Sequence, residues 1–159
     1  MEILLSGTPM IKNNIQLTPV SPKDLGRTYD LFKEGLYDVS EKAFGWDETF
    51  QHERFNKAYR PEWFYWIEND SKQVGYVCFN VREKDLHVHV LIISKEFQSA
   101  GFGKDVMELL ADIAKQSSVD VTLSTLKNNA GAVKFYQRLG YKIVGQDDYF
   151  YDLILKLRD

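Results

Sequence analysis

Hydrophobic positions along the chain change their spacing several times, and each change predicts a different element. Apolar residues fall on one helical face in 21–37 and again in 103–116, which is the repeat of an amphipathic helix. Aromatic and β-branched residues instead gather in short runs bounded by polar turns, as is typical of strands. The pattern therefore predicts strands over 14–20, 62–69, 73–82, 85–93, 119–126, 141–146 and 149–157. It predicts helices over 21–37, 47–59, 103–116 and 129–140.

Particular residues mark the ends of these elements. Ser21 precedes Pro22 and is predicted to cap the first helix, while Asp47 is a candidate cap for the second. Pro61 is expected to stop the second helix, and Gly140 to end the last one in a left-handed conformation. Residues 1–12 fit no repeat and are expected to form a loose leader.

The order of elements predicts the class of fold. One strand and two helices come first, followed by strands joined by short polar turns, and then by strand–helix–strand units. Such units favour parallel neighbours with right-handed crossovers. We expect a mixed α/β sheet with helices on both faces, in a single domain over 1–159 whose core covers about 14–157.

Composition narrows the possible partners. Of the 159 residues, 44% are hydrophobic, which is enough to form a core. The net charge of −3 argues against nucleic acid as a partner. A single cysteine, Cys78, excludes an internal disulfide and fits a reducing compartment. No run reaches the roughly 20 apolar residues of a membrane helix, and the start does not resemble a signal peptide. We expect a cytoplasmic protein that does not bind membranes.

A glycine-containing loop over 96–104 joins a buried strand to a helix. Gln98, Gly101 and Gly103 occur there as Q-x-x-G-x-G. Lys104 is followed by Asp105, which excludes a Walker A loop, and Val106 stands where a dinucleotide-binding loop needs glycine or alanine. Two interpretations remain open, a tight strand-to-helix turn and a loop whose amides bind a phosphate at the start of the helix.

A second motif over 128–142 favours the phosphate-binding interpretation. Asn129 begins it, and Ala132, Phe135-Tyr136 and Leu139-Gly140-Tyr141 follow. With the loop Q-x-x-G-x-G, a helix and a strand before it, this segment resembles the GCN5-related N-acetyltransferase (GNAT) family. The order of elements over roughly 14–157 agrees with that family.

The resemblance implies a fold, a cofactor and a reaction. It implies a mostly antiparallel sheet of about seven strands whose fourth and fifth strands splay apart around acetyl-CoA, with no metal. The pantetheine arm would pair with the backbone of Leu91, Ile92 and Ile93. The amides of seven loop residues would hold the pyrophosphate: Gln98, Ser99, Ala100, Gly101, Phe102, Gly103 and Lys104. Asn129 matches the asparagine that helps to hold the cofactor arm, and Tyr136 matches the tyrosine near the cofactor sulfur.

The implied activity is transfer of an acetyl group from acetyl-CoA to a primary amine, by direct attack in a ternary complex. The acceptor could belong to a small molecule or to a peptide or protein, and the sequence does not decide whether the chain forms a homodimer. An acyl-CoA-binding sensor or regulatory domain without turnover is the alternative. Tyr136 would donate a proton or hydrogen bond to the departing sulfur.

His87 and His89 lie two residues apart in the strand 85–93 and admit three interpretations. Metal binding would need further ligands, and only His52 and Cys78 are available without motif spacing. The rings could be part of the core, or they could accept the proton of the acceptor amine, and arylalkylamine N-acetyltransferases have a similar pair. Strand alternation would place both histidines on one face with Leu91 and Ile93, but the resemblance implies a bulge in this strand, which would break that alternation.

Residues 34–55 would cover the acceptor. Five carboxylates occur there among aromatic residues: Asp38, Glu41, Asp47, Glu48 and Glu53. They could bind a cationic amine, or they could form an ordinary solvated helix face. Tyr149 and Tyr151 on the last strand could also reach the acceptor.

Overall fold

The computed structural model describes residues 10–158, and the remainder of the predicted leader, 1–9, lies outside the described residues. Eight strands form one sheet in the order β1-β2-β3-β4-β5-β6-β8-β7. These strands are β1 (Ile11–Lys12), β2 (Ile15–Pro19), β3 (Phe64–Asn69), β4 (Lys72–Val81), β5 (Asp85–Ile93), β6 (Asp120–Leu126), β7 (Lys142–Gln146) and β8 (Phe150–Leu155). All pairings are antiparallel except that of β5 with β6, so the mixed, mostly antiparallel sheet is confirmed. The sheet has eight strands and not seven, because Ile11–Lys12, expected in a loose leader, pairs with β2.

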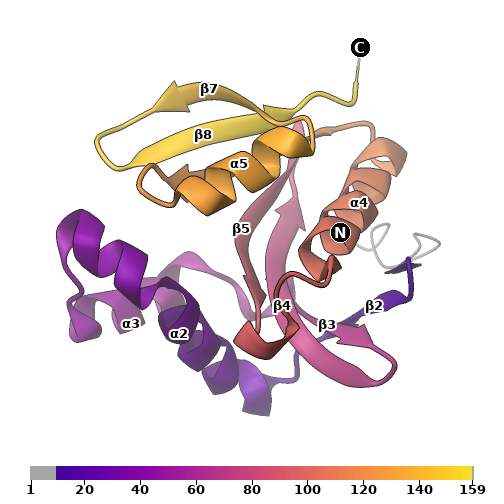
Figure 1. Cartoon of the computed structure of the whole chain (residues 1–159). Coiled ribbons are helices and arrows are strands. Elements are labelled where there is room, and N and C mark those ends of the chain that lie inside the picture. The colour runs from indigo at the N-terminus through magenta and orange to yellow at the C-terminus, as the bar shows by residue number, and fades with distance from the viewer. Residues whose placement is uncertain (1–9, 159) are drawn as a thin grey trace.

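Four α-helices flank the sheet (Figure 1). They are α2 (Leu25–Phe44), α3 (Glu48–Ala58), α4 (Phe102–Gln116) and α5 (Ala130–Arg138). Short 3-10 turns occupy Pro22–Asp24, Pro61–Trp63 and Lys95–Phe97.

The predicted helix boundaries have mixed outcomes. Ser21 does not cap α2, because a 3-10 turn intervenes and its hydroxyl instead donates to the Asp24 carboxylate at 3.0 Å. Asp47 does cap α3, accepting from the N–H of Phe50 at 2.9 Å. Gly140 has a φ of 99°, which confirms the left-handed end of α5. Helix α2 continues past the predicted end to Phe44, because residues 38–44 contain neither proline nor glycine and Gly45 stops it.

The helices cover the two faces of the sheet in pairs. On one face, α4 buries Val106, Leu109, Leu110 and Ile113 completely against the sheet, and α5 packs beside it. On the other face, α2 and α3 bury Tyr29, Phe32 and Phe55 against the strands. Helices therefore lie on both faces, as expected.

A β-bulge in β5 changes which side chains face which core. Cys78 pairs with Val90 while Phe79 pairs with Val88, so His89 is the extra residue. Before the bulge, Leu86 and Val88 belong to the core beneath α4; after it, Val90 and Ile92 belong to the core beneath α2 and α3. The even-numbered residues before the bulge and those after it therefore point to opposite faces of the sheet.

The pairing of β5 with β6 is short. It covers only four residue pairs, from Asp85 with Asp120 to Val88 with Leu123. Both strands continue, β5 to Ile93 and β6 to Leu126, but without pairing to each other. This divergence leaves a gap in the middle of the sheet, and it is where the site lies.

Candidate active site

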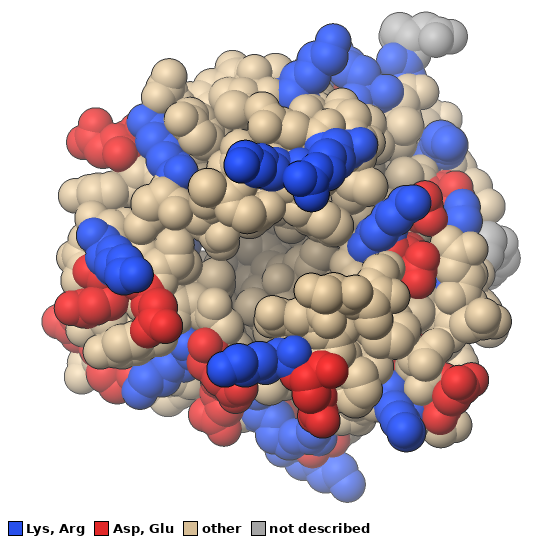
Figure 2. All heavy atoms as spheres, viewed as in Figure 1, with Lys and Arg blue, Asp and Glu red and all other residues tan. Residues whose placement is uncertain are grey.

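Three adjoining cavities follow the gap between β5 and β6 from one face of the sheet to the other. A central cavity of about 120 Å³ lies between the strands. Leu91, Ala132 and Tyr136 also border a cavity of about 680 Å³ beside α4. His89 and Asn129 also border a cavity of about 410 Å³ beneath α2 and α3. Figure 2 shows a hollow near the middle of this view, with no acidic or basic side chain visible on its floor.

The glycine loop forms one wall of the cavity beside α4. Ser99 and Gly101 both have a positive φ, 65° and 90°, so the chain turns sharply before the helix. The N–H of Asp105 donates to Gly101 O, and the amides of the three residues before Asp105 belong to the first turn of α4, where intrahelical partners are lacking. Those amides, with the positive end of the helix dipole, make a suitable environment for a phosphate group.

Close packing between the loop and α5 explains Gly103. A Cβ at this position would lie 3.3 Å from the Phe135 ring, so a side chain here would press α5 away from α4. The two sequence motifs are therefore in contact, since one supplies Gly103 and the other supplies Phe135.

The predicted cofactor residues are gathered only in part. The cavity beside α4 is bordered by Leu91, Ile93, Gln98, Ser99, Gly101, Phe102, Gly103, Lys104 and Tyr136. The side chain of Ile92 lies in the opposite core, and Ala100 is exposed and does not border this cavity. The Gln98 amide donates to Ile93 O at 2.9 Å, so its side chain closes the end of β5.

Asn129 is the N-cap of α5. Its Oδ1 accepts from the N–H of Ala132 at 3.3 Å, which positions the start of the helix. The side chain also borders the central cavity, where its NH₂ group remains available as a donor.

Tyr136 comes from α5 and borders both the central cavity and the cavity beside α4. Its ring packs against Phe135 and Tyr141, with centroids 5.0 Å and 5.6 Å away. Burial raises the pKa of Tyr136 to about 12, so the phenol keeps its proton at neutral pH. A protonated phenol at this position can act as a donor.

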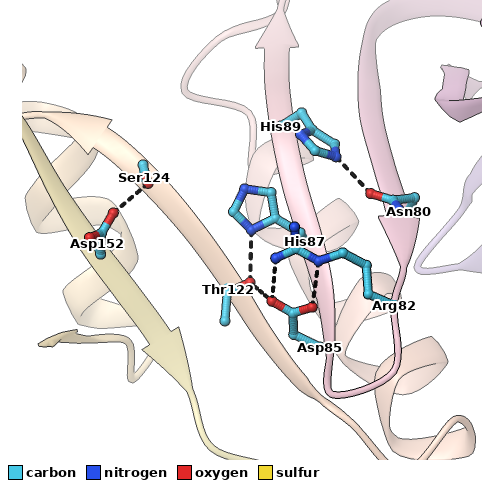
Figure 3. A network of polar contacts seen from close by, with 8 residues as sticks. All are labelled: Asn80, Arg82, Asp85, His87, His89, Thr122, Ser124 and Asp152. Atoms are coloured by element: carbon cyan, nitrogen blue, oxygen red, sulfur yellow. Dashed lines mark hydrogen bonds and ion pairs between the residues drawn. The ribbon is translucent and has the colours of Figure 1, made fainter. Parts of the chain in front are cut away.

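The two histidines belong to a polar network on the face of the sheet that α2 and α3 cover (Figure 3). His87 Nδ1 lies 2.8 Å from Thr122 Oγ1, and that hydroxyl lies 2.6 Å from Asp85 Oδ2. Arg82 donates two hydrogen bonds to Asp85, at 2.7 Å and 2.6 Å. His89 Nε2 lies 2.7 Å from Asn80 Oδ1.

These contacts define the tautomers. An ionised carboxylate only accepts, so the Thr122 hydroxyl donates to Asp85 and accepts from His87 Nδ1–H. Nε2 of His87 then carries its lone pair. Asn80 Oδ1 accepts from His89 Nε2–H, which leaves the lone pair of His89 on Nδ1. Each ring therefore keeps one basic nitrogen.

Both histidines are neutral at pH 7. Desolvation, helped by the charge of Arg82, lowers the pKa of His87, while Asp85 and Asp152 act against this. Desolvation also lowers the pKa of His89, to about 4, with His87 and Arg82 contributing. The pKa of Asp85 falls to about 2, chiefly through its hydrogen bonds from Arg82. The carboxylate thus stays charged beside neutral rings.

His89 has the more direct access to the gap. It borders both the central cavity and the cavity beneath α2 and α3. Its ring stacks on Trp63 with centroids 4.6 Å apart and planes 6° from parallel, which holds it in place. His87 lies behind it, at 4.8 Å between ring centroids.

Sequence reasoning missed the residues that support the histidines. Asp85 alternates with His87 and His89 in the same strand, and that spacing was a signal that could have identified it. Thr122 and Ser124 likewise alternate with the apolar Val121 and Leu123 in β6, and Ser124 donates to Asp152 at 2.7 Å. No local pattern points to Trp63 or Arg54, which come near the site only through tertiary packing.

The suggestion that carboxylates of 34–55 bind the acceptor finds no support in the cavity beneath α2 and α3. Among the described residues, no aspartate or glutamate borders it. Glu48 is held by Lys33, Trp46 and Tyr29, which lower its pKa to about 2. Asp47 caps α3, and Glu41 accepts from the backbone N–H of Trp46. Tyr149 does border the cavity, whereas Tyr151 lies elsewhere, beside Lys127.

Comparison with solved structures defines the fold class. An acetyltransferase from Thermus thermophilus aligns with a TM-score of 0.69 and 19% identity, over 91% of this chain and 97% of that one. Arabidopsis thaliana Naa50, solved in complex with a bisubstrate analogue, aligns with a TM-score of 0.64 and 15% identity, over 91% and 99%. The splayed sheet with helices on both faces is therefore the acyl-CoA N-acyltransferase fold.

Sequence comparison gives the family. The model of the acetyltransferase (GNAT) family matches residues 27–141, and the chain belongs to this family. The 5-NmdU N-acetyltransferase of Pseudomonas phage PaMx11 is 26% identical over 91 residues, which are 56% of this chain. The match spans 64% of the phage protein, slightly less than two thirds of its length.

Two further observations concern residues 10–158 as a whole. None of the helices in this part of the chain is both long and apolar enough to cross a membrane. Nor do the His, Cys, Asp and Glu side chains described there form a group of three or more that could hold a metal ion.

Proposed function

We propose that this acetyltransferase moves the acetyl group of acetyl-CoA to a primary amine by direct attack in a ternary complex. The observation that carries the proposal is the series of cavities through the gap between β5 and β6. Tyr136 borders its cofactor side and His89 its acceptor side, so a thioester and an amine could meet between them.

The cofactor would bind in the cavity beside α4. Its pyrophosphate would lie against the first amides of α4, and its pantetheine arm would run along the unpaired edge of β5 near Leu91 and Ile93. Volume and chemistry support this placement, because the cavity of about 680 Å³ combines an apolar wall with a helix N-terminus.

The acceptor amine must lose a proton to react. Its nitrogen attacks the thioester carbonyl, the C–N bond forms, and the C–S bond breaks. The proton passes from the amine to the basic Nδ1 of His89 and is later released to solvent, while the neutral ring of His87 lies behind it. Tyr136 gives its proton to the departing sulfur, and the phenolate is later reprotonated from solvent.

An acyl-enzyme intermediate has little support. Cys78 is buried in β4, and burial raises the pKa of its thiol well above the ordinary value. Such a thiol is a poor nucleophile at neutral pH.

The test is release of free CoA thiol by the purified protein from acetyl-CoA with a panel of amines. Amine-dependent release with formation of the N-acetyl product supports the proposal. Tight binding of acetyl-CoA without release by any amine would support the other candidate, a non-catalytic acyl-CoA sensor. The neutral histidines at the gap favour the enzyme, because a sensor has no use for a proton acceptor there.

A further inference from the structure

The walls of the cavity beneath α2 and α3 are mainly aromatic. The ring-bearing side chains that border it are Phe32, Phe44, Phe50, Tyr59, Tyr149 and Phe150, besides His89. Phe44 and Tyr149 meet edge to face at 5.3 Å and connect the end of α2 with the turn between β7 and β8. With a volume of about 410 Å³, the cavity has the size of pockets that hold small molecules. Such walls select a flat apolar body rather than an extended peptide.

The charge of this cavity is positive. Arg54 is the one permanently charged side chain among the described residues that border it. None of the ion pairs found within residues 10–158 includes Arg54. The polar groups nearby are neutral, and two of them, Ser40 and Gln51, are each 6% exposed. A guanidinium that no carboxylate neutralises is suited to bind an anionic group on a ligand.

Arg54 lies one aromatic ring away from the reacting centre. Its guanidinium interacts with the Tyr59 hydroxyl, where it opposes the rise in pKa that burial gives Tyr59. The Tyr59 ring in turn lies 5.5 Å from the ring of His89. A ligand with an amine beside His89 and an anion beside Arg54 would therefore need a rigid spacer about one ring long.

We infer that the acceptor is a small amine on a flat aromatic body that also carries an anionic group, and that Arg54 binds this group. The inference rests on the proposed function, since it names the substrate class of the same site. Carboxylate and phosphate are both compatible with a guanidinium, which binds either in a bidentate manner.

Matched amines can test this. The substrates are 4-(aminomethyl)benzoate, its neutral isostere 4-(aminomethyl)benzamide, 4-(aminomethyl)phenyl phosphate and 4-(aminomethyl)cyclohexanecarboxylate, each followed by thiol release. We expect kcat/KM for the benzoate or the phosphate to exceed that for the benzamide by about tenfold or more. The better anion identifies the group. The cyclohexane compound should be several-fold poorer than the benzoate, because its body is not flat.

Two variants assign the preference. Arg54→Gln should reduce the ratio of kcat/KM for the benzoate to that for the benzamide to near one. Arg60→Gln is the matched control, because Arg60 is also exposed, pairs with Glu62 at 3.8 Å and does not border the cavity. It should leave the ratio unchanged.

Several results would overturn the inference. Equal turnover of benzoate, phosphate and benzamide would show that the cavity has no anion site. A preference for the anions that persists in Arg54→Gln would show that Arg54 does not bind them. Equal turnover of the cyclohexane compound would remove the aromatic requirement. If no amine is acetylated, the affinity of the protein for the same amines is measured in the presence of CoA. This measurement tests the anion site separately from the transfer reaction. An Arg54-dependent preference for the anions would keep this site and refute the transfer reaction, and no preference would refute both.

Discussion

His87 and His89 face each other at 4.8 Å, with ring planes 70° apart, on the side of the sheet opposite Leu91 and Ile93. Strict alternation would have placed all four side chains together, and the bulge at His89 separates them. His89 thus borders the cavity beneath α2 and α3, with His87 behind it, while Leu91 and Ile93 border the cavity beside α4. The bulge in β5 therefore lets one strand place its histidines on one face of the sheet and the apolar side chains of Leu91 and Ile93 on the other.

Tyr136→Phe should lower kcat by about a hundredfold and change the KM for acetyl-CoA little. The substitution removes the proton donor but keeps the ring that packs against Phe135 and Tyr141. Steady-state thiol release at varied acetyl-CoA concentration measures both constants. Equal turnover would exclude Tyr136 from the reaction.

Tyr141→Phe is the matched control for that change. The Tyr141 hydroxyl is buried and has no hydrogen-bond partner among residues 10–158, so its removal should leave kcat unchanged. It should raise the free energy of unfolding by about 1 kcal/mol, because a desolvated hydroxyl is lost. Urea denaturation of the variant checks the second part, and a loss of stability would contradict it.

Two substitutions should move the acid limb of the pH–rate profile in opposite directions. The neutral histidines are the active forms, so activity falls as pH drops through their pKa. Arg82→Gln removes a cation that lowers both pKa values, and the limb should shift to higher pH. Asp85→Asn removes an anion that raises both, and the limb should shift to lower pH. Shifts of the same sign in both variants would exclude the histidines as the titrating groups.

Acidification should also destabilise the folded protein. The pKa of His89 is about 4 in the fold and lies below its ordinary value of 6.5. Between these values the unfolded chain binds a proton that the folded chain does not, so stability falls as pH drops from 6.5 toward 4. The drop in Tm between about pH 7 and pH 5 should be smaller in His89→Phe. An identical drop would show that His89 does not cause it.

Gly101→Ala and Gly26→Ala should change stability with opposite signs. Neither added Cβ would meet an atom within 4 Å, so only the backbone differs. Gly101 has a φ of 90°, and alanine there should cost about 1 kcal/mol. Gly26 lies within α2, where alanine should stabilise by about 0.5–1 kcal/mol. Chemical denaturation of both variants compares them, and Gly101→Ala should also raise the KM for acetyl-CoA.

Much of the architecture could be predicted where a periodic pattern was strong. The strand 85–93 and the helix predicted from 103 match Asp85–Ile93 and Phe102–Gln116 almost residue for residue. The two-residue strand Ile11–Lys12 was missed because so short a segment has no period. The end of α2 was placed too early because residues 38–44 lack a clear apolar repeat.

The candidate site was harder to predict, because its geometry depends on contacts between distant segments. Both glycine-loop and Asn129 motifs could be located from local sequence. Arg54 and Trp63 could not, since their positions follow from how α3 and the turn after it pack against the sheet. The resemblance implied a bulge in this strand, and the register of β4 with β5 confirms it. Its position at His89 could not be read from the residues, because Leu86, Val88, Val90 and Ile92 alternate without interruption.

The bulge has a consequence for how this strand can evolve. Deleting the extra residue, His89, would restore regular pairing with β4, because Val88 already pairs with Phe79 and Val90 with Cys78. Leu91 and Ile93 would stay on the side of the cavity beside α4, and Val90 and Ile92 would stay in the core beneath α2 and α3. The strand can therefore gain or lose this one residue without moving its neighbours, and here the added residue carries the ring that borders the central cavity.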